Sequence, residues 1–355
     1  MGENIKYIPV EQQVEKLKSQ GLIIPDENEA ISYLKIYGYS NLIKSYRDPY
    51  IVVNKDGEKL YRSGVTIYQI LSLYSFDKNL RNSVMASMLD LEEHIKEVVA
   101  DVVAQSFGTN QDDYLQFKNF KDRRKKERFT LAYILNSFRK ALLSDKNPVR
   151  HYREKYGVVP PWILFKNVYF STIINFLDLF KPAQQQSVAN RLYDNSILGL
   201  KENSLRKLMM DTLYLCLEYR NLVAHGGRTY NYQQHYSNVR VNEIFPTPTA
   251  INPNGFNGLL TLLSLFRYKI PYNNLNHSLE YSANEHFANF PQDVTYLGQI
   301  LNIDFIPKQF VYTTRSSNKY HLLPHCSGIS NPVAVELDEA ERRGLLPCRR
   351  CVKPL

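Results

Sequence analysis

The stretch LRNSVMASMLDLEEHIKEVVADVV, residues 80–103, decides the fold of this chain. Its apolar residues recur at steps of three and four, which is the spacing of one face of an α-helix. This stripe consists of Leu80, Val84, Met88, Leu91, Ile95, Val98 and Val102. The helical pattern reaches from Val65 to Phe107 and ends at Gly108, so it predicts one long helix with a buried side. We therefore expect a mostly helical, all-α protein.

Shorter helical patterns lie on both sides of this stretch. Asp26 and Gly38 are residue types that begin and end helices, and Asp56-Gly57 is typical of a turn between two extended segments. Two apolar segments after residue 255 predict a pair of helices that packs back on the main domain. The helical segments expected in this way are residues 10–20, 26–37, 165–180, 204–225, 258–268 and 286–302.

Changes in composition divide the chain into three parts. The segment FPTPTAINPNG (245–255) is rich in Pro, Asn and Gly and marks a break, and the composition changes again near Pro307. We expect a helical domain at residues 1–245, a helical extension at 246–306 and a small module at 307–355. A length of 355 residues is enough for two or three domains with a sizeable core.

The charge balance is moderately basic, with 44 Lys and Arg against 35 Asp and Glu, and it suits a protein that meets phosphates. The run KDRRKKER (121–128) carries the densest positive charge, which could follow an RNA backbone or form a solvated face. The start MGENIKYIPVEQQ has no apolar run of a secretion signal, and no apolar stretch approaches the about 20 residues of a membrane span. We therefore expect a cytoplasmic protein without membrane contact.

The last thirty residues hold three of the four cysteines. His321 and Cys326 form an H-x4-C pair, and Cys348 and Cys351 form a C-x2-C pair. Three thiolates and one imidazole are the donor set of a closed structural zinc site, so we predict that these four residues bind Zn²⁺. A module this short needs the metal to fold. His325 is a competing ligand, and a redox role of the cysteines is the alternative.

A polar motif ends the helix that is expected over residues 204–225. In RNLVAHGG (220–227), Arg220 and Asn221 precede His225, and two glycines follow. Around a regular helix, Arg220 and His225 lie about 140° apart. They converge on one substrate only if the helix loosens at the glycines, or if a second copy of the motif approaches across a two-fold axis. The ordinary alternative is that both side chains interact with the last carbonyl groups of the helix.

The chemistry available to this motif is RNA cleavage without a metal. An imidazole can take the proton of a ribose 2′-hydroxyl near neutral pH, and a guanidinium can hold the phosphate and offset its growing negative charge. The products are a 2′,3′-cyclic phosphate and a 5′-hydroxyl. Asn221 could orient the imidazole or the phosphate through its amide.

The motif also carries a family resemblance. LEYRNLVAHGGRTYN (217–231) resembles the RN-x3-H-x2-R-x-[YW]-N signature of the Abi-like (abortive-infection, AbiD/AbiF-type) proteins of bacterial phage defence, which belong to the HEPN ribonuclease superfamily. The resemblance covers roughly residues 10–300, and the terminal module is similar to small zinc-binding tails of nucleic-acid-handling proteins. Further segments that match in the family's order are NEAISYLKIYGYSNLIKSYR (28–47), SGVTIYQILSLYSFDKNLRN (63–82), LDLEEHIKEVVA (89–100) and PPWILFKNVYFSTIINF (160–176).

The resemblance implies a HEPN-like helical bundle, a homodimer that pairs the two motifs, and a metal-independent endoribonuclease whose catalytic residues are Arg220, Asn221 and His225. It also implies that Arg228 and Asn231 brace the loop or contact the RNA backbone. The alternative is a non-catalytic RNA-binding or regulatory HEPN protein that binds a structured non-coding RNA. Such an RNA could also serve as an inhibitor of the nuclease.

Three further residues follow from the family motifs. Gly227 stands where many members have a bulkier residue, which we expect to loosen the loop. Glu92 either faces the active site as a substrate-binding residue or forms an i, i+4 pair with Lys96. Asp77 and Arg81, which lie in the Phe-Asp-x2-Leu-Arg segment at spacing i, i+4, are expected to form a structural pair.

Overall fold

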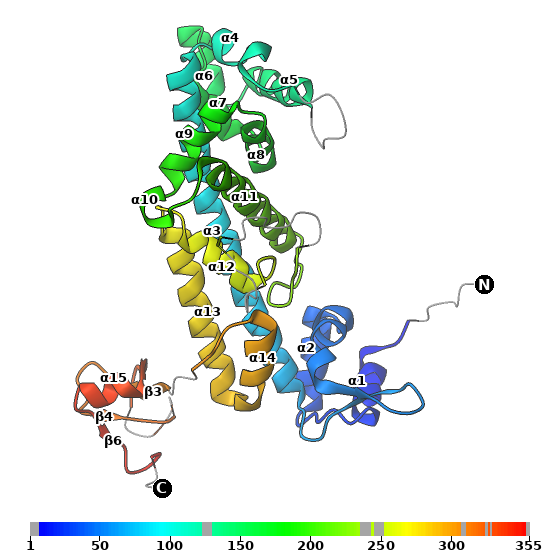
Figure 1. The fold of residues 1–355 in the computed structure, drawn as a ribbon. Coiled ribbons are helices and arrows are strands. Elements are labelled where there is room, and N and C mark those ends of the chain that lie inside the picture. Colours follow the sequence, from blue (N-terminus) through cyan, green and yellow to red (C-terminus); the bar gives the residue numbers. More distant parts are fainter. Residues whose placement is uncertain are drawn as a thin grey trace. The chain divides into compact units, whose positions relative to one another are not determined.

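The computed structural model describes residues 7–122, 130–234, 243–244, 252–306, 310–323, 326 and 329–352, and its ribbon is drawn in Figure 1. The chain forms two compact units, one of residues Met1–Phe76 and Glu280–Leu355 and the other of Asp77–Leu279. Both divisions fall inside helices, namely α3 (Ile67–Phe107) and α13 (Ile270–Asn289). The predicted long helix is therefore confirmed, and its residues belong to both units.

The N-terminal part of the first unit is built as the sequence predicts. Helices α1 (Val10–Ser19) and α2 (Glu27–Tyr37) pack together, and the carboxylate of Asp26 accepts hydrogen bonds from the first backbone N–H groups of α2. Strands β1 (Ile51–Val53) and β2 (Lys59–Tyr61) form the expected antiparallel hairpin. A π-helical turn, η1 (Ser40–Lys44), and a 3₁₀ turn, η2 (Asp48–Tyr50), connect α2 to this hairpin.

A buried polar network ties the first unit together around Asp293, which ends the 3₁₀ turn η5 (Pro291–Asp293) ahead of α14 (Val294–Leu301). Its carboxylate accepts hydrogen bonds from the Tyr50 hydroxyl at 2.7 Å and the Gln69 amide at 2.9 Å, and it lies 3.0 Å from His286 Nε2. Burial alone would raise the pKa of Asp293. The hydrogen bonds from His286, Tyr50 and Gln69 together outweigh this effect, so the pKa is lowered. The carboxylate is therefore stable as an anion in a buried place.

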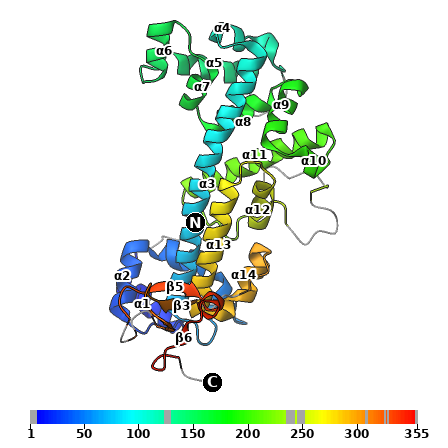
Figure 2. The same ribbon diagram turned by 90° about the vertical axis from the view of Figure 1, so that its left-hand side faces the viewer.

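The terminal module contains short strands and one short helix. Strands β3 (Phe310–Thr313) and β5 (Val333–Glu336) pair antiparallel, and β4 (Lys319–Tyr320) and β6 (Leu346–Pro347) pair parallel. Helix α15 (Leu337–Arg342) packs on β3 and β5, which lie side by side in Figure 2. Among the described residues of the module, the buried hydrophobic core consists of Val311, Tyr320 and Ala340. The expected combination of a mostly helical chain and a small α/β module at the end is thus observed.

The described residues of the second unit contain helices and connecting loops but no strand. The helix that positions the site, α11 (Glu202–Ala224), packs on its neighbours α8, α9 and α12, and α8 and α11 are seen together in Figure 1. The other helices of the unit are α4 (Gln111–Tyr114), α5 (Leu131–Leu142), α6 (Val149–Tyr156), α7 (Pro161–Leu164), α8 (Phe170–Asp178), α9 (Pro182–Leu192), α10 (Asn195–Leu198) and α12 (Phe256–Ser264), with 3₁₀ turns η3 (Phe117–Asn119) and η4 (Phe165–Asn167).

Two helix predictions need correction. The helix expected over residues 165–180 is shorter, because α8 begins only at Phe170. Ahead of α8, the side-chain amide of Asn167 donates a hydrogen bond to the Ile163 carbonyl, and the backbone of Val168 is extended. The Asn167 side chain therefore competes with the backbone hydrogen bonds that would continue a helix. The sequence reading also missed most of α13, which is rich in Asn and polar residues; its buried Leu275 and Leu279 carry the helical spacing.

The predicted domain boundaries, after residues 245 and 306, remain a prediction, since both fall next to residues outside the described ones. Most of the basic run at 121–128 also lies outside the described residues, which end at Asp122 and resume at Thr130. Among the helices that the structure describes, none has the length and apolar content that crossing a bilayer requires.

Candidate active site and metal centre

Helix α11 ends in a Schellman motif directly after the predicted catalytic residues. The N–H of Gly226 donates to the Val223 carbonyl at 3.1 Å, and the N–H of Gly227 donates to the Leu222 carbonyl at 2.9 Å. Gly226 has φ of 71°, which side chains rarely adopt and glycine adopts freely. His225 is the exposed capping residue of this helix end. Its backbone is thus fixed by the two glycines.

Gly227 lies in a closely packed place, and the expectation that it loosens the loop stays a prediction. A Cβ atom at this position would lie 2.3 Å from Leu222 Cδ1 and 3.1 Å from the Leu222 carbonyl oxygen. The glycine therefore allows the chain to turn back closely against the last turn of α11.

The segment after His225 is held by two side chains of α3. Asp77 is fully buried, and its Oδ1 accepts hydrogen bonds from the backbone N–H groups of Thr229 at 2.8 Å and Tyr230 at 2.9 Å. Arg81 donates from Nη1 to the Gly226 carbonyl at 2.9 Å, and its Nε lies 3.7 Å from Asp77 Oδ2. The expected ion pair is thus confirmed, and it also fixes the loop that carries the second half of the motif.

One face of α11 and the facing side of α8 enclose a pocket of about 440 Å³. His225 lies four residues after Asn221, so both residues lie on this face of the helix. The residues that line the pocket are Ser171, Asn175, Tyr214, Leu217, Glu218, Asn221, Leu222, His225, Gly227 and Tyr232. Two of the three predicted catalytic residues are therefore brought together at one hollow of the surface.

Arg220 does not line this pocket, but its guanidinium contacts a residue that does. Its Nη1 donates a hydrogen bond to Asn221 Oδ1 at 3.4 Å. Its Nε is buried without a hydrogen-bond partner in the described part of the chain. Because α11 stays regular up to Ala224, the angular separation expected from the sequence persists within one chain.

The other predicted site residues are spread more widely. Arg228 and Asn231 are both half-buried in the loop that Asp77 holds. Glu92 lies 2.7 Å from Lys96 Nζ, which confirms their i, i+4 pair. Glu92 lines another pocket, of about 600 Å³, together with Lys96, Trp162 and other residues, and this pocket has no lining residue in common with that of His225.

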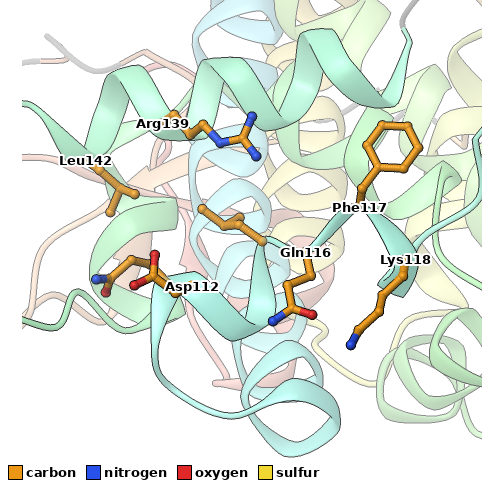
Figure 3. Close-up of a pocket in the computed structure, with 8 residues that line it drawn as sticks. Asp112, Gln116, Phe117, Lys118, Arg139 and Leu142 are labelled. Atoms are coloured by element: carbon orange, nitrogen blue, oxygen red, sulfur yellow. The ribbon is translucent and has the colours of Figure 1, made fainter.

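A third hollow, of about 370 Å³, lies on the same unit. Figure 3 shows Arg139 of α5 on one side of this hollow and Asp112, Gln116 and Lys118 on the other. Two cations and one carboxylate therefore face a common space. The predicted charge run itself continues into residues outside those described.

The four predicted metal ligands form a compact cluster in the terminal module. The ligand atoms of His321, Cys326, Cys348 and Cys351 all lie within 4.8 Å of one another. The Sγ atoms of Cys326 and Cys348 are 3.9 Å apart, and Cys351 Sγ is 3.7 Å from His321 Nδ1. Tetrahedral Zn–S bonds of about 2.3 Å separate two sulfurs by about 3.8 Å, so the cluster has the size that such an ion requires.

The thiols of the cluster differ in their tendency to ionise. A backbone hydrogen bond from Arg350 is the main reason why the pKa of Cys348 is lowered to about 7. Burial, followed by the neighbouring thiols, raises the pKa of Cys326 to about 11. A cation placed among these sulfurs would favour the ionised form of each thiol. The cluster could therefore hold a metal ion.

A comparison with known families assigns the helical part of the chain. The family model of the Abi-like proteins matches residues 32–231, which include α3, all the residues that line the pocket except Tyr232, and the whole polar motif. The chain belongs to the Abi-like protein family. No curated protein and no solved structure matches the sequence of this Abi-like protein.

Several residues of the Abi-like site were missed by the sequence reading. Asn175 is a single amide in the middle of the apolar helix α8, and such an isolated polar residue could have marked it. Tyr214 and Glu218 precede Asn221 and His225 at helical spacing, which places all four on one face. Their position on the face of α11 that carries the motif was the available signal.

Proposed function

We propose that this Abi-like protein is a metal-independent endoribonuclease of an abortive-infection system directed against phage. The family name, which stands for abortive infection, supports the biological role. The observation that carries the activity is the position of Asn221 and His225 at one pocket, next to an arginine whose Nε has no partner among the described residues. We also infer that the helical part has the HEPN fold and acts as a homodimer in the cytoplasm.

In the proposed reaction, His225 takes the proton of a ribose 2′-hydroxyl. The 2′-oxygen then forms a bond to phosphorus, and the bond between phosphorus and the 5′-oxygen breaks. The leaving 5′-oxygen takes a proton from water, so the products are a 2′,3′-cyclic phosphate and a 5′-hydroxyl. The guanidinium of Arg220 stabilises the extra negative charge on the phosphate oxygens during this step.

The geometry of one chain supports the proposed homodimer. Arg220 does not line the pocket of His225, and the Schellman motif keeps the helix regular up to its end. In our proposal, a two-fold axis brings Arg220 of one chain to His225 of the other, so that each of two equal sites contains one of each. The exposed helix end can take part in such a contact, since His225, Ala224 and Gly226 are all exposed in the single chain.

The metal that fits the terminal cluster best is zinc. Three sulfurs and one nitrogen at these separations suit a tetrahedral ion of borderline softness, and all four positions are filled by protein ligands. The role of this Zn²⁺ is structural, because a closed site leaves no position for water or substrate. It stabilises a module whose own buried core is very small.

The activity is tested by incubating the purified protein with total RNA in the presence of EDTA. We expect fragments with cyclic phosphate and 5′-hydroxyl ends, and a loss of about 100-fold or more in rate for His225→Ala. Because His225 is exposed, the unfolding temperature of His225→Ala should stay near that of the wild type. The exposed His277 on α13 provides the matched control His277→Ala, which should keep full activity.

Two results would contradict the proposal. One is RNA binding without cleavage by the wild type and by both variants, which would assign this protein to the RNA-binding or regulatory class. The other is cleavage that needs an added divalent cation. If the protein purifies with a bound non-coding RNA, removal of that RNA should raise the activity, as expected of an inhibitor.

A further inference from the structure

The pocket beside His225 extends past the residues that the proposed reaction uses. Tyr214 and Glu218 of α11, Asn175 of α8 and Tyr232 of the following loop line the remainder of it. None of them is needed for proton transfer or for charge stabilisation at the phosphate. Their chemistry therefore indicates what the pocket binds next to the scissile bond.

Glu218 offers a fixed carboxylate to this pocket. The Tyr232 hydroxyl donates to its Oε2 at 3.2 Å, and the ring of Tyr232 packs edge-on against buried Tyr219, with centroids 5.3 Å apart. In the described part of the chain no Lys or Arg forms an ion pair with Glu218. Oε1 and the second lone pair of Oε2 thus remain available to accept hydrogen bonds from a ligand.

Asn175 offers the complementary group from the opposite wall. It is 7% exposed and lies between apolar residues of α8. The Tyr214 hydroxyl donates to its Oδ1 at 3.1 Å, which leaves the amide NH₂ as the free end, and this end has no hydrogen-bond partner among the described residues. This amide donor is open to the pocket, so an acceptor on a bound ligand can pair with it.

We propose that this pocket binds a guanine base, an inference that rests on the proposed ribonuclease function. Guanine presents two adjacent N–H donors, N1–H and N2–H, beside the O6 acceptor, and a carboxylate accepts from both donors. Glu218 takes these two donors and the Asn175 amide donates to O6. Adenine, cytosine and uracil have no pair of adjacent donors on this edge, so they cannot make the same contacts.

The remaining walls suit a flat ring. Leu217 and Leu222 provide apolar surface, and Tyr214 and Tyr232 provide aromatic surface on which a base can stack. The pocket volume of about 440 Å³ lies in the usual range of about 300–1,000 Å³ for ligand sites. Because His225 ends the same helix face, the base in this pocket belongs to the nucleotide whose 2′-hydroxyl reacts. The preferred substrate is therefore single-stranded RNA, cut on the 3′ side of guanosine.

The test is the affinity of the full-length protein for the four nucleoside 3′-monophosphates, measured by isothermal titration calorimetry. We expect guanosine 3′-monophosphate to bind about tenfold more tightly than the other three. In Glu218→Gln this preference should be lost, because the new amide places a donor against the donors of guanine. The matched control Glu202→Gln changes an exposed glutamate of the same helix outside the pocket and should keep the preference.

A second variant tests the same contact in case Glu218→Gln does not fold. Tyr232→Phe removes only the hydroxyl that orients Glu218 and should reduce the preference for guanosine while the thermal melt is unchanged. Equal affinity for all four nucleotides, or tight binding of an arginine-containing peptide in their place, overturns the inference. RNA cleavage without any base preference would reject the guanine pocket and keep the ribonuclease, whereas selective guanosine binding without cleavage would reject the ribonuclease and keep the pocket.

Discussion

The end of α11 and the terminal module are two sites fixed by opposite means. At the end of α11, the buried carboxylate of Asp77 holds the loop through two backbone N–H groups, inside a unit with a large apolar core. In the terminal module, three thiols and one imidazole form a cluster, and the buried hydrophobic core among the described residues is small. The first site is held in place by hydrogen bonds and packing within the chain. The second has four side chains that a metal ion could hold together.

The largest effect should follow from removing the metal. We expect one Zn²⁺ per chain by native mass spectrometry, and none in Cys348→Ser. Without the ion, amides of residues 310–352 should lose protection in hydrogen–deuterium exchange, while RNA cleavage continues. The matched control is Cys216→Ala, since Cys216 is buried in α11 and lies outside the cluster. A module that keeps its protection after complete chelation would contradict a structural role of zinc.

A smaller effect is expected when the carboxylate that holds the loop after His225 loses its charge. Asp77→Asn removes charged hydrogen bonds to Thr229 and Tyr230 and should lower the free energy of unfolding by about 1–3 kcal/mol. The turnover of RNA should also fall, whereas nucleotide binding in the pocket should change less. Asp101→Asn on the same helix breaks a surface pair with Arg191 and serves as the control. Equal losses in both variants would mean that Asp77 has no special role at the site.

The smallest effect concerns pH, and it extends the comparison to a second buried carboxylate. The pKa of Asp293 is lowered in the folded chain, so its contribution to stability is present above the unfolded pKa of about 3.9 and is lost as the pH falls through the folded value. Thermal melts between pH 7 and pH 3 should therefore fall more steeply for the wild type than for Asp293→Asn. If the unfolding temperatures of the two proteins fall in parallel with pH, Asp293 does not cause the loss of stability in acid.

The sequence predicted those features that depend on local spacing. The apolar stripe gave the extent of α3, Asp26 marked the start of α2, and the H-x4-C and C-x2-C pairs selected the four clustered ligands. The order of the family motifs located the polar residues at the end of α11. Each of these signals lies within a short stretch of chain, where geometry follows directly from spacing.

Contacts between distant segments could not be read in this way. Asp77 was expected to pair with Arg81, but its bonds to Thr229 and Tyr230 span more than 150 residues. The same holds for Asn175 and Tyr214, which meet only because α8 packs on α11. Such contacts depend on tertiary packing, for which a single sequence has no periodic signal.

The most direct test of the central claim is complementation between two inactive variants. Arg220→Ala and His225→Ala are each expected to be inactive alone, and mixing them after reversible dissociation produces mixed dimers. Because each proposed site takes Arg220 from one chain and His225 from the other, the equimolar mixture should recover about a quarter of the wild-type cleavage rate. A mixture that stays as inactive as its components, although mass spectrometry confirms the mixed dimer, would contradict a site shared between two chains.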